Sequence, residues 1–283
     1  MILAAVAGLV VGFAIRVATP GLARIRGKRP PLRPPGMEIL TAAGFVMVHQ
    51  EWGFGLDAGK WFLFVALLAA VTAADFLAKL IPDRITFPGA GIGLIYSAVA
   101  PDDICGFLHH TGILGVMGLS PGHGGGLLLA LLGALIAFGV LQLFRGVFGR
   151  IAGLEVMGMG DSKLLGMMGA FLGPEMVLFS LVPGLLCGLV IGIVYTRLVG
   201  SPHFPFGPAL GLGGLLAVLY TPRILAGMRW FTEVVGSMSR GVVWILNFAL
   251  IGVAIWLILR VRRRAADYKK QIDDEYSDLE DED

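Results

Sequence analysis

Long apolar stretches constrain the fold of this chain more than any other feature of its sequence. A stretch of about 20 predominantly apolar residues is long enough to cross the hydrocarbon core of a bilayer as a helix. Such stretches recur along the chain, for example at residues 60–80, 125–144 and 175–197. They do not alternate apolar with polar residues, as the strands of a transmembrane barrel would. The sequence therefore predicts an all-α integral membrane protein that crosses the bilayer several times.

The composition supports a membrane-embedded helix bundle. Of the 283 residues, 56% are hydrophobic and only 15% are charged, which is too apolar for a soluble domain. The 42 glycines suit helix packing in lipid, where small residues let backbones approach closely. We predict about eight helices plus one additional C-terminal helix. They are expected near residues 1–19, 37–55, 60–80, 86–101, 125–144, 163–174, 175–197, 207–221 and 241–260.

The first of the two helices around Gly173-Pro174 is too short to cross a bilayer without tilt or local thinning. A re-entrant arrangement of this pair is therefore an open alternative to two complete spans.

The distribution of basic residues predicts the topology. Short loops rich in Lys and Arg stay on the cytoplasmic side of a membrane. The connections at 20–36, 75–85 and 145–163 all carry such residues and all fall on one side if the N-terminus lies outside. Residues 102–124 then form an external loop. The predicted location is a bacterial inner (cytoplasmic) membrane, although the arginines beyond residue 222 fit this topology less well.

Three segments differ in composition. Residues 1–222 are predicted to form the membrane-embedded core, and residues 223–264 an additional amphipathic segment with a transmembrane helix. Residues 265–283 are strongly acidic and are predicted to be a disordered cytoplasmic tail. No nucleic-acid partner is expected, and the oligomeric state is left open.

No metal site is predicted. The two cysteines, Cys105 and Cys187, stand alone and form no CxxC pair. The histidines His109, His110 and His123 fall within residues 102–124, the loop predicted to lie outside, so a loop role is preferred over a ligand role.

Two aspartates are the best candidates for chemistry, because an ionisable residue at the edge of an apolar span suggests function. Asp75 follows the apolar run 61–74, and Asp161 directly precedes another apolar run. The predicted topology places both at the cytoplasmic end of the bundle. Taken singly, each is equally typical of a polar residue that borders a helix.

A close pair of carboxylates can hydrolyse an amide bond. Two carboxylates in a site of low dielectric constant cannot both be ionised easily, so they share a proton. The ionised member takes a proton from water while the protonated member polarises the carbonyl group. Gly158 and Gly160 would let an extended peptide approach Asp161 and would permit backbone angles closed to other residues.

The sequence around both aspartates resembles the type IV prepilin peptidase family. Asp75 is followed at fixed distance by residues 80–88, LIPDRITFP, which are similar to the first-aspartate motif. Residues 158–164, GMGDSKL, are similar to the second, GxGDxKL. Three further segments extend the resemblance over roughly residues 1–222. These are GLVVGF at 8–13, PGMEILT at 35–41 and FPFGP at 204–208.

The resemblance implies an aspartic endopeptidase with Asp75 and Asp161 as its catalytic residues. Its substrates would be type IV prepilins or pseudopilins with a short basic leader, and the bilayer would be its environment. Many members carry two CxxC pairs in the first cytoplasmic loop, whereas residues 20–36 contain no cysteine. Those longer members also N-methylate the new amino terminus with S-adenosylmethionine. Cleavage is expected to need no cofactor, and methylation by this chain is left uncertain.

Other residues in or near the motifs are expected to shape the site or bind substrate. This set comprises Gly158, Gly160, Lys163, Pro82 and Glu38. Glu38 is interpreted mainly as a partner for the positive end of a helix dipole, and Lys163 mainly as an anchor at the lipid interface.

Two functions from other classes are weighed against the peptidase. A proton-coupled transporter also uses intramembrane carboxylates, but it predicts acidic residues at mid-membrane depth and an internal repeat. A non-catalytic scaffold that recruits partners through the acidic tail leaves both aspartate motifs unexplained.

Overall fold

The computed structural model describes residues 1–22, 36–100, 123–152, 158–199 and 205–239, with single positions between 241 and 260. The chain divides into two units. The first comprises Met1–Leu141 and Met159–Leu225, and the second comprises Gln142–Gly158 and Ala226–Asp283. The described residues form helices and no strand, which confirms the predicted all-α class. The predicted number of helices and the three predicted segments stay predictions.

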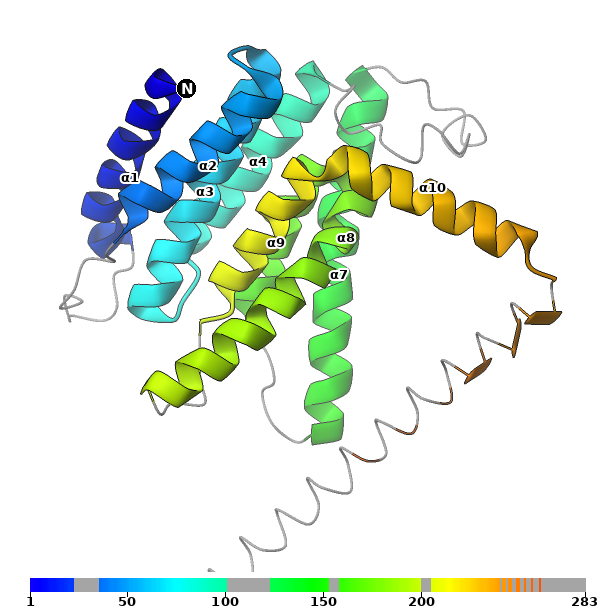
Figure 1. Ribbon diagram of the computed structural model, residues 1–283. Coiled ribbons are helices and arrows are strands. Elements are labelled where there is room, and N and C mark those ends of the chain that lie inside the picture. The colour runs from blue at the N-terminus through cyan, green and yellow to red at the C-terminus, as the bar shows by residue number, and fades with distance from the viewer. Residues whose placement is uncertain are drawn as a thin grey trace, which may run out of the picture. The chain divides into compact units, whose positions relative to one another are not determined.

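The helices follow the apolar stretches of the sequence (Figure 1). In chain order they are α1 Ile2–Leu22, α2 Met37–Trp52, α3 Leu56–Ala78, α4 Asp83–Val99, α7 His123–Ala152, α8 Met159–Val199, α9 Gly207–Leu219 and α10 Thr221–Ser237. Predictions for most of loops 20–36 and 102–124, for most of the helix at 241–260 and for the acidic tail lie outside the described residues.

Several helices are long and apolar enough to cross a membrane. Within the described residues these spans are Ile2–Thr19, Ala58–Ala78, Gly125–Val147 and Met159–Arg197. They identify the chain as a multi-pass membrane protein. Helices α2 and α4 form where the sequence predicts them, but with 16 and 17 residues they are shorter than these spans.

Helix α8 is interrupted where the sequence predicts a boundary between two helices. Gly173 has φ 75° and ψ 175°, which is not helical and which glycine adopts without steric cost. Pro174 follows and cannot donate a backbone hydrogen bond. The N-terminal part, however, begins at Met159 instead of residue 163. Asp161 therefore lies in the first turn of a helix and not in the preceding loop.

Helix α3 is the central helix of the first unit, because it contacts α1, α2, α4, α8 and α9. Phe64, Ala73 and Ala74 on this helix are completely buried. Small residues bring other helices together, as the glycine content predicts. A Cβ atom on Gly133 of α7 would overlap the backbone at Gly169 of α8, and the reverse also holds. The bundle thus surrounds the helix that carries Asp75.

Candidate active site

Asp75 lies in the last turn of α3 and only 5% of its surface is exposed. The preceding turn is apolar and buried, so the carboxylate is removed from water on the side of the protein core. Burial of a charged or polar group without a hydrogen-bond partner costs several kcal/mol. The structure therefore has to supply a donor from a neighbouring element.

That donor is the backbone of α9. The N–H of Gly207 donates a hydrogen bond of 2.8 Å to Oδ2 of Asp75. Gly207 is the first residue of α9, where N–H groups have no partner within the helix and the helix dipole favours negative charge. A Cβ atom at position 207 would lie 2.7 Å from the same oxygen. The contact therefore requires glycine.

The segment PFGP holds the start of α9 in place. Pro205 and Pro208 are buried, and proline is well suited to the first turn of a helix because it needs no hydrogen-bond acceptor there. The carbonyl of Phe206 accepts hydrogen bonds from Ala209 and Leu210 at 3.0 and 3.1 Å. These contacts fix the direction in which the Gly207 N–H points.

Asp161 is the third residue of α8 and is half-buried. A carboxylate in the first turn of a helix is stabilised by the positive end of the helix dipole. One helical turn further along α8, Leu164 and Leu165 are completely buried and anchor this end of the helix in the core. Asp161 therefore sits at the boundary between the packed bundle and its surface.

Two contacts bring the C-terminal end of α3 and the N-terminal end of α8 to the same end of the bundle. Ile81 packs against Gly160, where a Cβ atom would lie 3.0 Å from the Ile81 Cβ. Lys163 Nζ forms an ion pair of 2.6 Å with Asp83 Oδ1. Asp75 lies shortly before Ile81, and Asp161 directly follows Gly160. Both aspartates therefore occupy one end of the first unit.

Residues 62–193, which contain both aspartates, match the model of the type IV leader peptidase family. This segment belongs to the type IV leader peptidase family. The PFGP motif, which supplies Gly207 to the candidate site, lies outside the matched residues. No solved structure matches the chain.

Curated relatives of this leader peptidase domain carry the name prepilin leader peptidase/N-methyltransferase. The Pseudomonas aeruginosa protein is 32% identical over 204 residues, which cover 70% of this chain and 60% of the relative. The Aeromonas hydrophila protein is 30% identical over 214 residues, which cover 74% of this chain and 65% of the relative. The Neisseria gonorrhoeae protein is 28% identical over 200 residues (71% and 62%). The chain thus spans about three fifths of the length of these relatives.

Pro82 and Glu38, which were also singled out in the sequence, both have structural partners. Pro82 precedes α4, and its carbonyl accepts hydrogen bonds from Ile85 and Thr86 at 3.0 and 3.3 Å. Glu38, in the first turn of α2, forms an ion pair of 2.8 Å with Arg16 of α1.

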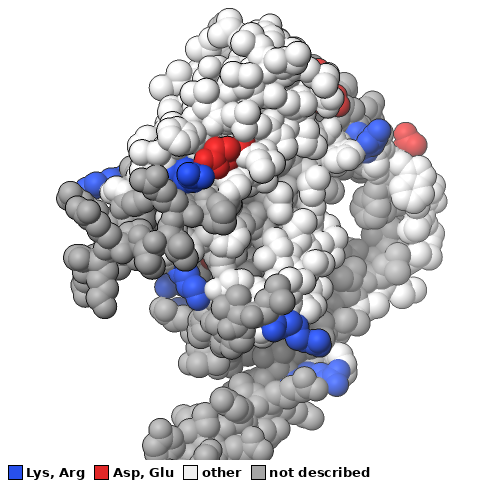
Figure 2. All heavy atoms as spheres, turned by 60° about the vertical axis from the view of Figure 1, so that its left-hand side comes forward, with Lys and Arg blue, Asp and Glu red and all other residues white. Residues whose placement is uncertain are grey.

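On the face shown in Figure 2, uncharged side chains predominate among the described residues, as expected for a surface in contact with lipid.

Gly160 of the GMGD motif does not have the unusual backbone angles that the sequence led us to expect. Gly160 lies inside α8 with helical geometry and is not among the positive-φ glycines of the described chain. Its missing side chain makes room for Ile81, so packing already explains the glycine. Gly158 is exposed just before α8, and its role in substrate approach stays a prediction.

Gly207 is the residue of the site whose role sequence reasoning missed. The FPFGP segment resembles a family motif, but Gly207 and Asp75 are 132 positions apart in the chain and nothing in the sequence pairs them. Among the described residues, no group of three or more His, Cys, Asp or Glu side chains could hold a metal ion. Metal-free cleavage remains a prediction.

Proposed function

We propose that this chain is a membrane aspartic endopeptidase that cleaves the short basic leader from type IV prepilins or pseudopilins. The observation that carries the proposal is the placement of the two aspartates. A buried Asp75, bound by the Gly207 N–H, shares one end of the bundle with Asp161 of the GMGD motif. The family match and the names of the relatives support the substrate class.

In this proposal Asp75 and Asp161 divide the work of amide hydrolysis. The ionised carboxylate accepts a proton from water as the water oxygen attacks the carbonyl carbon, and the O–H of the other, protonated aspartate donates a hydrogen bond to the carbonyl oxygen. The leaving amine receives the proton when the tetrahedral intermediate collapses. The Gly207 N–H occupies Oδ2 of Asp75. We therefore assign Oδ1, the oxygen that Gly207 does not bind, to the water or the shared proton.

The reaction is proposed to take place at the cytoplasmic face of a bacterial inner membrane. Short basic loops favour that side, and basic residues lie near both aspartates: Lys79 directly after α3, Arg84 at the start of α4 and Lys163 at the start of α8. An enzyme at this level meets the junction between a soluble leader and the apolar helix that follows it. The transporter alternative expects mid-membrane carboxylates, whereas Asp75 is in the last turn of α3.

No cofactor takes part in the proposed cleavage. Methylation of the new amino terminus would use S-adenosylmethionine and is not included in the proposal.

The test is to incubate the detergent-solubilised full chain with a basic-leader prepilin and to read the new N-terminus by mass spectrometry. Cleavage at the end of the leader is expected. The mass also shows whether a methyl group has been added. An intact substrate after incubation with correctly folded protein, under conditions in which a related peptidase cuts it, would contradict the proposal.

A further inference from the structure

A cleft lies at the opposite end of the first unit from the aspartates. It has a volume of about 320 Å³ and is lined by Met47, Gln50, Glu51, Leu219, Tyr220 and Arg223. Helix α9 runs from the site to the cleft, because Gly207 begins it and Leu219 ends it. With 13 residues and a rise of about 1.5 Å per residue, the two ends are about 18 Å apart. The cleft is therefore separate from the peptidase site.

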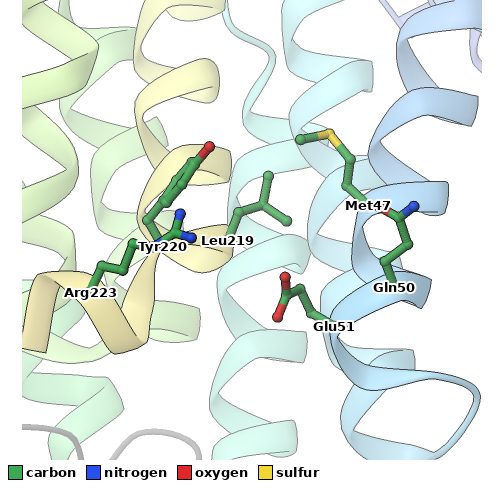
Figure 3. Close-up of a pocket in the computed structure, with 6 residues that line it drawn as sticks. All are labelled: Met47, Gln50, Glu51, Leu219, Tyr220 and Arg223. Carbon is green, nitrogen blue, oxygen red and sulfur yellow. The ribbon is translucent and has the colours of Figure 1, made fainter.

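The two walls of the cleft carry opposite charges. Glu51 projects from α2 into the space between the walls, and Arg223 lies on the other side beside Tyr220 (Figure 3). The Arg223 guanidinium stands over the Tyr220 ring at 5.2 Å from its centroid, which restrains the arginine side chain through a cation–π contact. Both charged residues are exposed. Within the described chain no ion pair joins Glu51 to Arg223.

Each charge also has the sign that its own helix end disfavours. Glu51 is in the last turn of α2, next to the negative end of that helix, and Arg223 is in the first turn of α10, next to a positive end. The C-terminal end of α2 therefore adds to the negative charge beside Glu51. On the other wall the positive end of α10 follows the negative end of α9, so the positive charge there comes from the Arg223 guanidinium itself. A ligand with a cationic group and an anionic group would match both walls at once.

The surroundings place this cleft at the level of lipid headgroups. Trp52, Trp61 and Tyr220 gather at this end of the bundle, with Trp52 and Trp61 rings 5.7 Å apart. Tryptophan and tyrosine concentrate where a membrane meets water. The adjacent span begins at Ala58, close to the end of α2. Met47 and Leu219 add apolar surface to the lining of the cleft, against which the upper part of an acyl chain would pack.

We propose that the cleft binds the headgroup of a zwitterionic membrane lipid, with phosphoethanolamine as the matching chemistry. The phosphate contacts Arg223, whose planar guanidinium donates two parallel hydrogen bonds to phosphate oxygens. The primary ammonium group donates to the Glu51 carboxylate. A quaternary ammonium group has no N–H to donate, and a neutral glycerol headgroup leaves Glu51 beside the lipid phosphate.

The test measures binding of short-chain phosphatidylethanolamine to the detergent-solubilised full chain by native mass spectrometry over a concentration series. Glu51→Gln and Arg223→Gln are each expected to weaken binding by about tenfold, as for loss of one charge-assisted hydrogen bond. The matched control is Arg197→Gln, which changes an exposed charge two residues after Tyr195, whose ring lies beside Lys79 at the aspartate end of the first unit. This control is expected to bind like the parent protein, and size-exclusion profiles verify the fold of all three variants.

A second lipid separates this site from general lipid contact. Short-chain phosphatidylglycerol has the phosphate but no ammonium group, so Glu51→Gln is expected to strengthen its binding, whereas Arg223→Gln weakens it. Equal effects of Glu51→Gln on both lipids, or unchanged binding in both variants, would overturn the proposal. Soluble phosphoethanolamine forms the last arm. If soluble phosphoethanolamine bound as tightly as the lipid, the occupant would be a soluble zwitterion, which would contradict a membrane lipid.

Discussion

The Asp75 carboxylate depends on one backbone N–H that comes from a distant part of the chain. The side chain is 5% exposed, and its position in the last turn of α3 leaves Oδ2 directed at the first residue of α9. Every substitution except proline keeps the backbone N–H of residue 207, so Gly207→Ala retains the donor and changes only the space around it. Both aspartates and this glycine can therefore be tested separately.

At each aspartate we expect replacement by asparagine to reduce cleavage by about a hundredfold or more, in line with loss of a general acid or base. Asp75→Asn and Asp161→Asn keep the size of the side chain but cannot exchange the proton. The measurement is the rate of prepilin cleavage, with membrane expression matched. Normal cleavage by either variant would remove that aspartate from the proposed mechanism.

Gly207→Ala is expected to reduce kcat by about a hundredfold, because small displacements of a catalytic group have effects of this size. The added methyl group would lie 2.7 Å from Asp75 Oδ2 and must push the carboxylate away. KM should change much less, since the substrate-binding surface is retained. Gly91→Ala is the matched control, because a Cβ atom there meets nothing within 4 Å. Similar kcat values for the two variants would argue against positioning by Gly207.

At the scale of elements, helix ends and helix crossings do most of the positioning. The first turns of α8 and α9 carry Asp161 and Gly207, while the last turn of α3 carries Asp75. The site is therefore an assembly of three helix ends, and its geometry depends on how closely the helices pack. Glycines at the crossings set those distances.

Gly133→Val is expected to destabilise the packing of α7 against α8 by about 1–3 kcal/mol or more, the range for overpacked cores. A side chain there would overlap the backbone at Gly169. Gly139→Val on the same helix introduces the same β-branched residue where a Cβ atom meets nothing within 4 Å. Thermal unfolding in detergent compares the two, and the apparent Tm should fall only for Gly133→Val. Equal Tm values for the two variants would contradict the close packing of α7 against α8 at Gly133.

At the scale of the whole molecule, the main prediction concerns the membrane face. Lys79 after α3 and Lys163 on α8 accompany the aspartates, and the basic loops predict that this end is cytoplasmic. The cleft lined by Glu51 and Arg223 lies at the other end of the first unit. One labelling experiment can test both assignments.

Single cysteines at Leu80 and Met159, which are 60% and 48% exposed, should react with a membrane-impermeant maleimide only from the cytoplasmic side. Phe54, which is 57% exposed, should react only from the other side when changed to cysteine. The native Cys105 and Cys187 are first replaced by serine, and right-side-out and inverted vesicles are compared. Labelling of Leu80→Cys and Met159→Cys from opposite sides would separate the aspartates and exclude a shared site.

The sequence by itself determined the helical membrane class, the apolar stretches and the two aspartate motifs. These features are local: an apolar run long enough to cross a bilayer forms a helix whatever surrounds it, because its backbone groups must be paired within the segment. The break at Gly173 was also predictable, because glycine followed by proline is a local signal. Helix α8, however, begins at Met159, four residues earlier than the hydrophobic pattern predicted.

Only the tertiary structure decided which groups meet. Gly207 and Asp75 are 132 positions apart, and nothing in the character of glycine indicates that its N–H binds a buried carboxylate. Gly160 faces Ile81, and Lys163 pairs with Asp83, because helix crossings place these positions together. Such contacts depend on the relative position of helices, which arises from the packing of many side chains at once and is not encoded in any short segment.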